Sequence, residues 1–100
     1  AREYGPRIRA NCVSPAFIRT PLTELVAGTA ELREAVDAAT PLARIGEADE
    51  VADVVVFLCS DGASYVTGQN VVIDGGAALT NAQVDSLLSP FVEPALKPWR

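Results

Sequence analysis

The segment 47–60, EADEVADVVVFLCS, constrains the fold most, because it has helical spacing but almost no polar face. Acidic residues stand at its start, where the backbone dipole of a helix favours negative charge. Val51, Val55 and Leu58 follow at positions i, i+4 and i+7, and most residues between them are apolar as well. A helix that is apolar on nearly every side is covered on both sides. We therefore expect one side on a sheet and the other against a second layer or a second subunit.

A short strand is predicted on each side of this helix. The first is 8–13, IRANCV, which Ser14 and Pro15 bring to an end. The second is 69–74, QNVVID, which halts at a Gly-Gly pair that needs glycine's freedom at positive φ. A strand, a helical crossover and another strand make a parallel unit. Because a parallel sheet needs more strands and burial on both faces, we expect an incomplete α/β fold, completed by another part of a longer protein or by another copy of the chain.

The stretch 21–40 between the first strand and this helix carries helical spacing that is interrupted near Gly28. Two short helices are predicted there, with Pro21 in the first turn of one and Thr29 capping the other. The preceding residues 1–4 read as a helix end, and 41–46 as a loop.

The C-terminal stretch has a different character. A short helical pattern covers 81–88, and the proline-punctuated tail SPFVEPALKPWR follows it. This tail is too apolar for a free end, so we expect it to pack along a neighbouring surface, such as another subunit's substrate cleft.

Composition excludes several function classes. A net charge of -5 argues against a nucleic-acid partner, because phosphate binding needs a basic face. No apolar run approaches the length of a membrane span. With no histidine and only two cysteines, Cys12 and Cys59, a metal site is not expected. Both cysteines lie in apolar segments and are predicted to be reduced core residues, which suits the cytoplasm. The chain has no methionine and opens with AREYGP, so we expect it to be part of something longer.

Two ordered stretches resemble the C-terminal part of a short-chain dehydrogenase/reductase. They are EYGPRIRANCVSPAFIRTPL and PLARIGEADEVADVVVFLCSDGASYVTGQNVVIDGG. No single tripeptide is decisive, but the ordered set is specific. The resemblance implies that 1–76 is the C-terminal part of a Rossmann-type doubly wound parallel sheet, with 21–46 as its substrate loop. The remaining residues, 77–100, would be a C-terminal extension.

The resemblance also implies that the loop after the first strand closes over the nicotinamide end of NAD or NADP. Open α/β sheets bind ligands at the carboxyl ends of their strands, which agrees with this placement. Pro15 would abut the nicotinamide ring, and the backbone of Ile18 would bond its carboxamide. Thr20 would bond the carboxamide or the diphosphate. Ala16 stands where the family most often has glycine, so its methyl group is either harmless or restricts the approach of the ring.

The substrate side is less defined by the residues. By the same resemblance Leu22, Leu25 and Val26 would face a small-molecule substrate, with simple packing on the sheet as the equal alternative. Arg44 either pins the substrate loop to the main domain or caps local carbonyls, and the second interpretation is favoured.

The catalytic residues of this family have no counterpart in the chain. Its chemistry uses a Tyr-x-x-x-Lys pair, in which the lysine lowers the pKa of the tyrosine. Here Tyr4 is followed four residues later by Ile8, and Tyr65 by Gln69; the glycine-rich phosphate turn is missing too. We therefore expect part of an NAD(P)-dependent oxidoreductase that interconverts an alcohol and a carbonyl, inactive on its own.

The alternative is a non-catalytic association module. It would assemble into a homo-oligomer through the helix 47–60 and the strand 70–74. The residues do not select a substrate, nor do they choose between NAD and NADP.

Overall fold

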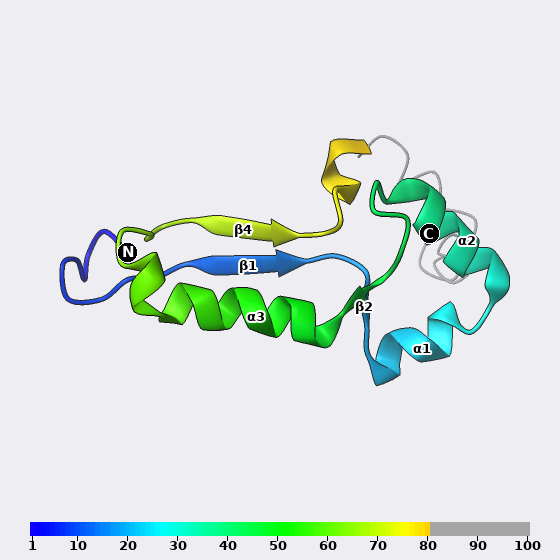
Figure 1. The fold of residues 1–100 in the computed structure, drawn as a ribbon, viewed down its shortest axis with the longest axis horizontal. Coiled ribbons are helices and arrows are strands. Elements are labelled where there is room, and N and C mark those ends of the chain that lie inside the picture. The colour runs from blue at the N-terminus through cyan, green and yellow to red at the C-terminus, as the bar shows by residue number, and fades with distance from the viewer. Residues whose placement is uncertain (81–100) are drawn as a thin grey trace, which may run out of the picture.

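The computed structural model describes residues 1–80, except the side chains of 25–27 and of residue 80. The helix predicted over 81–88 and the packing of the tail lie outside the described residues. In chain order the elements are β1 (Cys12–Pro15), β2 (Ile18–Arg19), α1 (Pro21–Ala27), α2 (Ala30–Ala39), β3 (Gly46–Glu47), α3 (Ala48–Cys59), η1 (Asp61–Ala63), β4 (Asn70–Ile73) and η2 (Ala77–Thr80) (Figure 1).

The main sheet consists of β1 and β4, which run parallel with α3 alongside them (Figure 1). This arrangement confirms the predicted strand–helix–strand unit. The register pairs Cys12 with Asn70 at one end and Pro15 with Ile73 at the other. The prediction that the first strand spans 8–13 was wrong, because its pairing with β4 begins only at Cys12. Proline is accepted at the last position, and the N–H of the next residue, Ala16, donates to the Ile73 carbonyl at 3.1 Å.

A second parallel bridge joins β2 to β3 and was not predicted. Ile18 pairs with Gly46 and Arg19 with Glu47, so the expected loop 41–46 ends in a strand residue. The Gly46 N–H donates to the Phe17 carbonyl at 3.0 Å. A Cβ atom on Gly46 would lie 2.8 Å from the Ile18 Cδ1 atom, so glycine allows the two segments to approach this closely.

The helix α3 forms as predicted, and the structure shows which of its residues turn toward the sheet. Glu47 and Glu50 form a capping box at its start, and the first turn is acidic. Val51, Val54 and Leu58 are half-buried, whereas Val55 is 40% exposed and Val56 67% exposed. The inward positions are therefore i, i+3 and i+7. The sheet covers one side of α3, as expected, and the other side is open.

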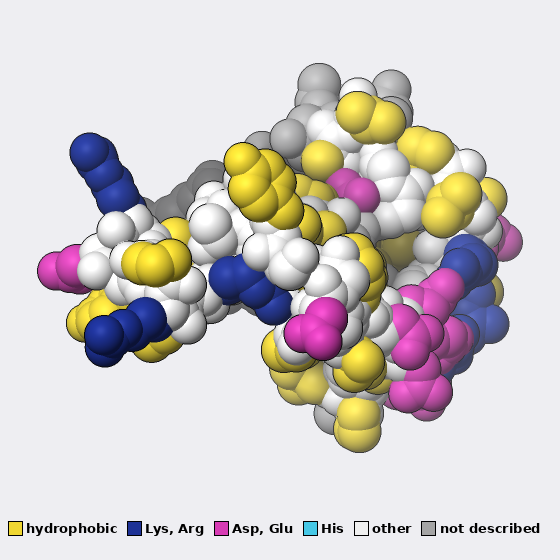
Figure 2. Space-filling model, turned by 60° about the vertical axis from the view of Figure 1, so that its left-hand side comes forward, with side chains coloured by type: hydrophobic (Ala, Val, Ile, Leu, Met, Phe, Trp, Pro, Cys, Tyr) yellow, Lys and Arg dark blue, Asp and Glu magenta, His cyan; other side chains and the backbone are white. Residues whose placement is uncertain are grey.

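Both cysteines are free thiols and both are exposed, so their predicted place in the core was wrong for the described structure. Cys12 begins β1 and Cys59 ends α3. An apolar sequence neighbourhood predicts burial only when another layer lies over it. Figure 2 shows hydrophobic side chains standing at the surface on the face that it presents.

The two short helices of the segment 21–40 are confirmed as α1 and α2. Thr29 occupies the N-cap position of α2, but its side chain makes no capping hydrogen bond. The first residues form turns rather than a helix end, with the Gly5 N–H donating to the Ala1 carbonyl at 3.1 Å.

The hydrophobic core lies beside the sheet rather than on it. Leu32 and Val36 of α2 are 5% and 4% exposed and pack with Ile45, and Phe17 contacts this cluster. Residues 16–46 thus form an excursion with its own small core, which leaves the sheet at the end of β1 and returns at β3. At the end of β4, Gly75 and Gly76 have φ values of 61° and 89°, which confirms the predicted positive φ.

No helix within residues 1–80 combines the length and the apolarity that crossing a bilayer requires.

Candidate functional site

The residues predicted to hold the nicotinamide form one continuous stretch at the carboxyl end of β1 (Figure 1). Pro15 is the last residue of this strand, Ile18 lies in β2 and Thr20 is the N-cap of α1. Pro15 and Ala16 are exposed, while Ile18 and Thr20 are half-buried. We call residues 15–20 the β1 loop. Its place agrees with the rule that ligands bind beyond the carboxyl ends of parallel strands.

Thr20 has a local structural role that the sequence interpretation missed. Its hydroxyl accepts a hydrogen bond from the Thr23 N–H at 3.2 Å, and the Thr20 N–H donates to Thr23 Oγ1 at 2.7 Å. Thr23 Oγ1 also donates to the Ile18 carbonyl at 2.7 Å. The pattern Thr-Pro-x-Thr is a capping signal that could have been recognised. These bonds fix the β1 loop to the start of α1.

A cleft of about 110 Å³ lies next to the β1 loop, at the carboxyl ends of the two long strands. Of the predicted cofactor residues, Ile18 lines this cleft, and Pro15, Ala16 and Thr20 do not. Phe17 contributes from the β1 loop, and Ile73 and Asp74 contribute from the end of β4. The cleft therefore joins the two strand ends but gathers only part of the predicted site.

Arg44 lies at the wall of this cleft and combines both roles considered for it. Its Nη1 donates to the Ile45 carbonyl at 3.3 Å, which is the favoured local capping role. Its two terminal nitrogens also bind both carboxylate oxygens of Glu50, at 2.6 and 2.8 Å. These bonds from Arg44, with a further bond from the Glu47 N–H, lower the pKa of Glu50 to about 2. Arg44 thus ties the end of the excursion to the first turn of α3.

Arg19 is a second bridging residue, and the sequence interpretation did not single it out. Its Nε donates to Glu47 at 3.0 Å, and its Nη1 donates to Glu24 at 3.2 Å. The hydrogen bond with Glu47, followed by that with Glu24, raises the pKa of Arg19. Glu47 is far away in the sequence, so no local spacing could have predicted this pair.

Asp74 directly follows β4 and stabilises the turn after this strand. Its carboxylate accepts hydrogen bonds from the N–H groups of Ala78 at 2.7 Å and Gly76 at 2.9 Å, and these bonds lower its pKa. Its role in the described structure is therefore to hold the turn after β4, as the strand-ending interpretation of the Asp-Gly-Gly sequence predicted.

The predicted substrate residues are only partly visible in the described structure. Leu22 is 74% exposed on α1, so it does not pack on the sheet. The side chains of Leu25 and Val26 lie outside the described part of the chain. The structure leaves the apolar Leu22 side chain free to meet a ligand.

A parallel strand–helix–strand unit whose loop opens at the carboxyl end of the strands defines a Rossmann-type α/β protein. A family model described as enoyl-(acyl carrier protein) reductase matches residues 1–78. The chain belongs to the short-chain dehydrogenase/reductase family, as the ordered sequence motifs predicted.

Curated relatives show the same family over most of the chain. A tropinone reductase homolog of Arabidopsis thaliana is 50% identical over 72 residues, which are 72% of this chain and 27% of the relative. A 3-oxoacyl-[acyl-carrier-protein] reductase of Thermotoga maritima is 49% identical over 75 residues, which are 75% of this chain and 30% of the relative. The chain thus spans less than a third of the length of these two proteins.

Solved structures agree with the fold. A short-chain dehydrogenase/reductase from Brucella melitensis is 41% identical with a TM-score of 0.70, over 76% of this chain and 30% of that one. A 4-hydroxyisoleucine dehydrogenase complexed with NADH is 36% identical with a TM-score of 0.69, over 72% of this chain and 30% of that one. An NADPH-dependent reductase of bacilysin biosynthesis is 35% identical with a TM-score of 0.63, over 70% of this chain and 30% of that one.

Proposed function

We propose that residues 1–76 are the C-terminal part of the Rossmann domain of an NAD(P)-dependent oxidoreductase that interconverts an alcohol and a carbonyl. The observation that carries this proposal is the position of the β1 loop, at the carboxyl end of β1 and beside the cleft. Family membership supports it, as do the related structures that use NADH and NADPH. Residues 21–46 would form the substrate loop and 77–100 an extension.

Two features of the β1 loop support the proposal that it binds a nicotinamide. Pro15 and Ala16 are exposed, so a flat ring has access to them. The Ile18 carbonyl is held by Thr23, which fixes the backbone whose polar groups would bond the carboxamide. When bound, the nicotinamide would supply hydride transfer. The residues of this chain would orient it, because a ring held at a fixed angle reacts faster than a mobile one.

Proton transfer is not assigned to this chain. Neither tyrosine is followed four residues later by lysine, so no residue is named as catalytic. We assign that step to other parts of the whole protein, and we expect the 100-residue chain alone to be inactive.

The test uses the whole protein that carries this sequence. Its binding of NADH and NADPH is measured by fluorescence, and its oxidation of the preferred one is followed with a panel of aldehydes and ketones. Ala16→Gly and Ala16→Phe form a graded series at the ring-facing position. We expect glycine to bind the cofactor at least as well as alanine, and phenylalanine to block it. Whole protein that binds neither cofactor would contradict the proposal.

A second candidate function, association without catalysis, is favoured by the open side of α3. Val56 and Phe57 are 67% and 52% exposed there, and Val72 of β4 is 50% exposed. Apolar side chains in such numbers on neighbouring elements favour contact with another layer, either the rest of the protein or a second copy in a homo-oligomer. Sedimentation of the chain at increasing concentration tests the homo-oligomer. A monomer throughout would count against it, and Phe57→Asp should weaken any assembly that forms.

We also propose a cytoplasmic location. The two cysteines of the chain are both free thiols in the structure, which suits a reducing compartment. Fractionation of cells that produce the whole protein tests this, and recovery from an oxidising compartment would contradict it.

A further inference from the structure

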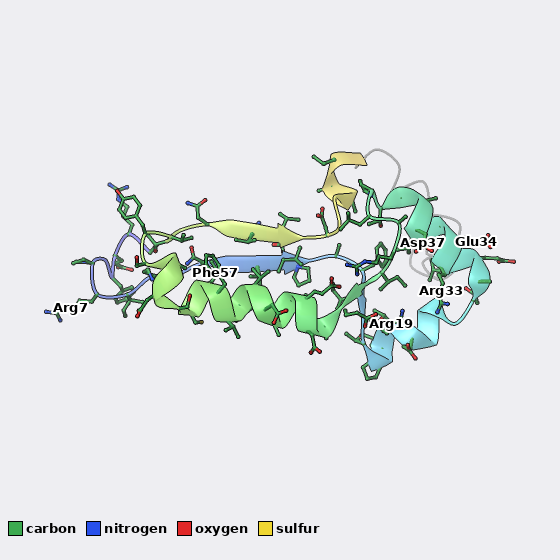
Figure 3. The ribbon with its side chains drawn as sticks, viewed as in Figure 1. Arg7, Arg19, Arg33, Glu34, Asp37 and Phe57 are labelled. Atoms are coloured by element: carbon green, nitrogen blue, oxygen red, sulfur yellow. The ribbon has the colours of Figure 1, made fainter. Side chains whose placement is uncertain are left out.

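Arg19 lies near the end of the β1 loop, directly after Ile18, whose backbone the proposed function assigns to the carboxamide of the nicotinamide. Figure 3 labels it beside α1, where β2 passes into this helix. Its guanidinium binds two carboxylates on different elements. Glu24 lies in the first turn of α1, and Glu47 is the N-cap of α3. The Arg19 side chain therefore spans the two ends of the excursion.

Further contacts continue this bridge into α3. The backbone N–H of Glu47 donates to the Glu50 carboxylate at 2.8 Å, and Glu50 is held in turn by Arg44. A row of contacts thus runs from Arg44 through Glu50 and Glu47 to Arg19 and ends at Glu24. Charge-assisted hydrogen bonds connect its members, and bonds of this kind are shorter and more directional than neutral ones.

The backbone of Arg19 also connects the two ends of the excursion, because Arg19 pairs with Glu47 between β2 and β3. β2 and β3 pair in parallel, and the close approach of Gly46 to Ile18 leaves little room for a shift between them. Only two residue pairs join β2 to β3, so loss of the Arg19 ion pairs would leave the Ile18 backbone held by this short pairing and its packing alone. The ion pairs are 41% to 59% exposed, so their contribution to global stability is small. Their local effect falls on the geometry of the β1 loop.

We propose that Arg19 is a positioning residue for the nicotinamide, which holds the Ile18 backbone in its binding geometry by anchoring β2 to Glu47 and Glu24. This inference rests on the proposed function. Arg19 acts through its carboxylate partners and is not required to touch the cofactor. Loss of the Arg19 side chain should therefore weaken binding of the nicotinamide half of the dinucleotide and leave binding of the other half unchanged.

The experiment compares two ligands on the whole protein. One is the reduced cofactor that the protein prefers, and the other is ADP-ribose, or its 2′-phosphate for an NADP enzyme, which lacks the nicotinamide. We expect Arg19→Ala to weaken binding of the reduced cofactor about three- to tenfold, because the loop then populates its binding geometry less often. Binding of ADP-ribose should stay unchanged.

Two further variants sharpen the result. Arg19→Lys keeps the charge but cannot bond two carboxylates through a planar fork, so we expect an intermediate loss. Glu47→Gln should weaken cofactor binding in the same direction, and combining it with Arg19→Ala should add less than the sum of the two effects. Arg7→Ala is the matched control, since Arg7 is exposed and lies at the opposite end of the molecule (Figure 3).

The outcomes separate this inference from the proposed function. Equal weakening of both ligands by Arg19→Ala would overturn it in favour of a direct diphosphate contact or a general loss of structure. Unchanged binding of both ligands would also overturn it. If the unmodified protein binds neither NADH nor NADPH, the proposed function fails, and this inference fails with it.

Discussion

Glu50 shows how a single exposed carboxylate can couple the stability of this molecule to pH. Its pKa is about 2, below its ordinary value of 4.5, chiefly because Arg44 bonds its ionised form. A carboxyl group with a lowered pKa in the folded state stabilises that state above its unfolded pKa, and this contribution disappears as pH falls through the folded pKa. We expect the urea midpoint of the whole protein to decrease as the pH is lowered from 4.5 to about 2.

Arg44→Ala should flatten this part of the pH profile, because it removes the largest cause of the lowered pKa. Glu34→Gln, on an exposed site of α2, is the control and should leave the profile unchanged. Since the pair is about half exposed, the effect is modest. An Arg44→Ala profile with the same acid slope as the parent would refute this role for the pair.

Gly76 illustrates a residue whose backbone conformation matters more than its contacts. Its φ is +89°, and a Cβ atom there would lie 2.8 Å from Pro41 Cγ. Gly76→Ala should therefore lower the free energy of unfolding by about 1–2 kcal/mol, measured by urea titration. Gly28→Ala is the matched control, because Gly28 has φ −66° in the right-handed region. A smaller loss at Gly76 than at Gly28 would contradict this explanation.

At the scale of single residues, the sequence predicted roles that depend on neighbouring residues. It did not predict the side-chain contacts of Arg44 and Arg19. The glycine pair after β4 and the capping position of Thr29 could be predicted, because each depends on neighbouring residues. The second bond partner of Arg44 could not, and neither could the role of Arg19. The Arg44–Glu50 pair spans the irregular entry to α3, where no helical spacing applies, and Glu47 comes within reach of Arg19 only after β2 has paired with β3.

On the scale of elements, α2 depends on its packing more than on its caps. Leu32 is 5% exposed in the small cluster with Val36 and Ile45, and no capping hydrogen bond holds the start of the helix. Leu32→Ala should cost about 2–3 kcal/mol, at the lower end for a buried leucine, because the cluster is small and able to collapse. Glu34→Ala, on the exposed side (Figure 3), should change the free energy of unfolding by less than about 0.5 kcal/mol.

Urea titration of both variants in the whole protein is the measurement. Equal midpoints for Leu32→Ala and Glu34→Ala would mean that the cluster contributes nothing to the cooperative fold.

The helices of the excursion were predictable because their signals are local, with a proline in the first turn of α1 and a break at Gly28. The inner face of α3 was not. Apolar residues on nearly every side leave no polar stripe to show which side faces the sheet, so the exposure of Val55 could not be predicted. The bounds of β1 also depend on its partner strand. A strand of two residues, such as β2 or β3, carries no periodic pattern that a sequence could reveal.

For the whole molecule, the chemistry of Cys59 reports what lies over α3. The thiol is exposed in the described structure and lines, with Leu58 and Val13, a hollow between α3 and β1. If other parts of the whole protein cover this side, as the proposed function requires, the thiol will react slowly with a maleimide in the native state and quickly in urea. Cys59→Ser removes this thiol alone and serves as the control, because labelling that persists in it comes from other cysteines. Rapid native labelling of Cys59 would show that this side stays open.

The pairing of β2 with β3 has a consequence for how such a molecule can change. It closes the base of the excursion at Ile18 and Gly46, while the sheet register is fixed separately between β1 and β4. The turn at Gly28 between α1 and α2 can be lengthened or shortened with little effect on the sheet, because loop closure depends only weakly on length. The exposed part of the excursion can therefore be varied separately from the sheet. A designer who varies exposed positions of α1 and this turn, and keeps Thr20, the core cluster and the closure residues, can alter specificity without rebuilding the scaffold.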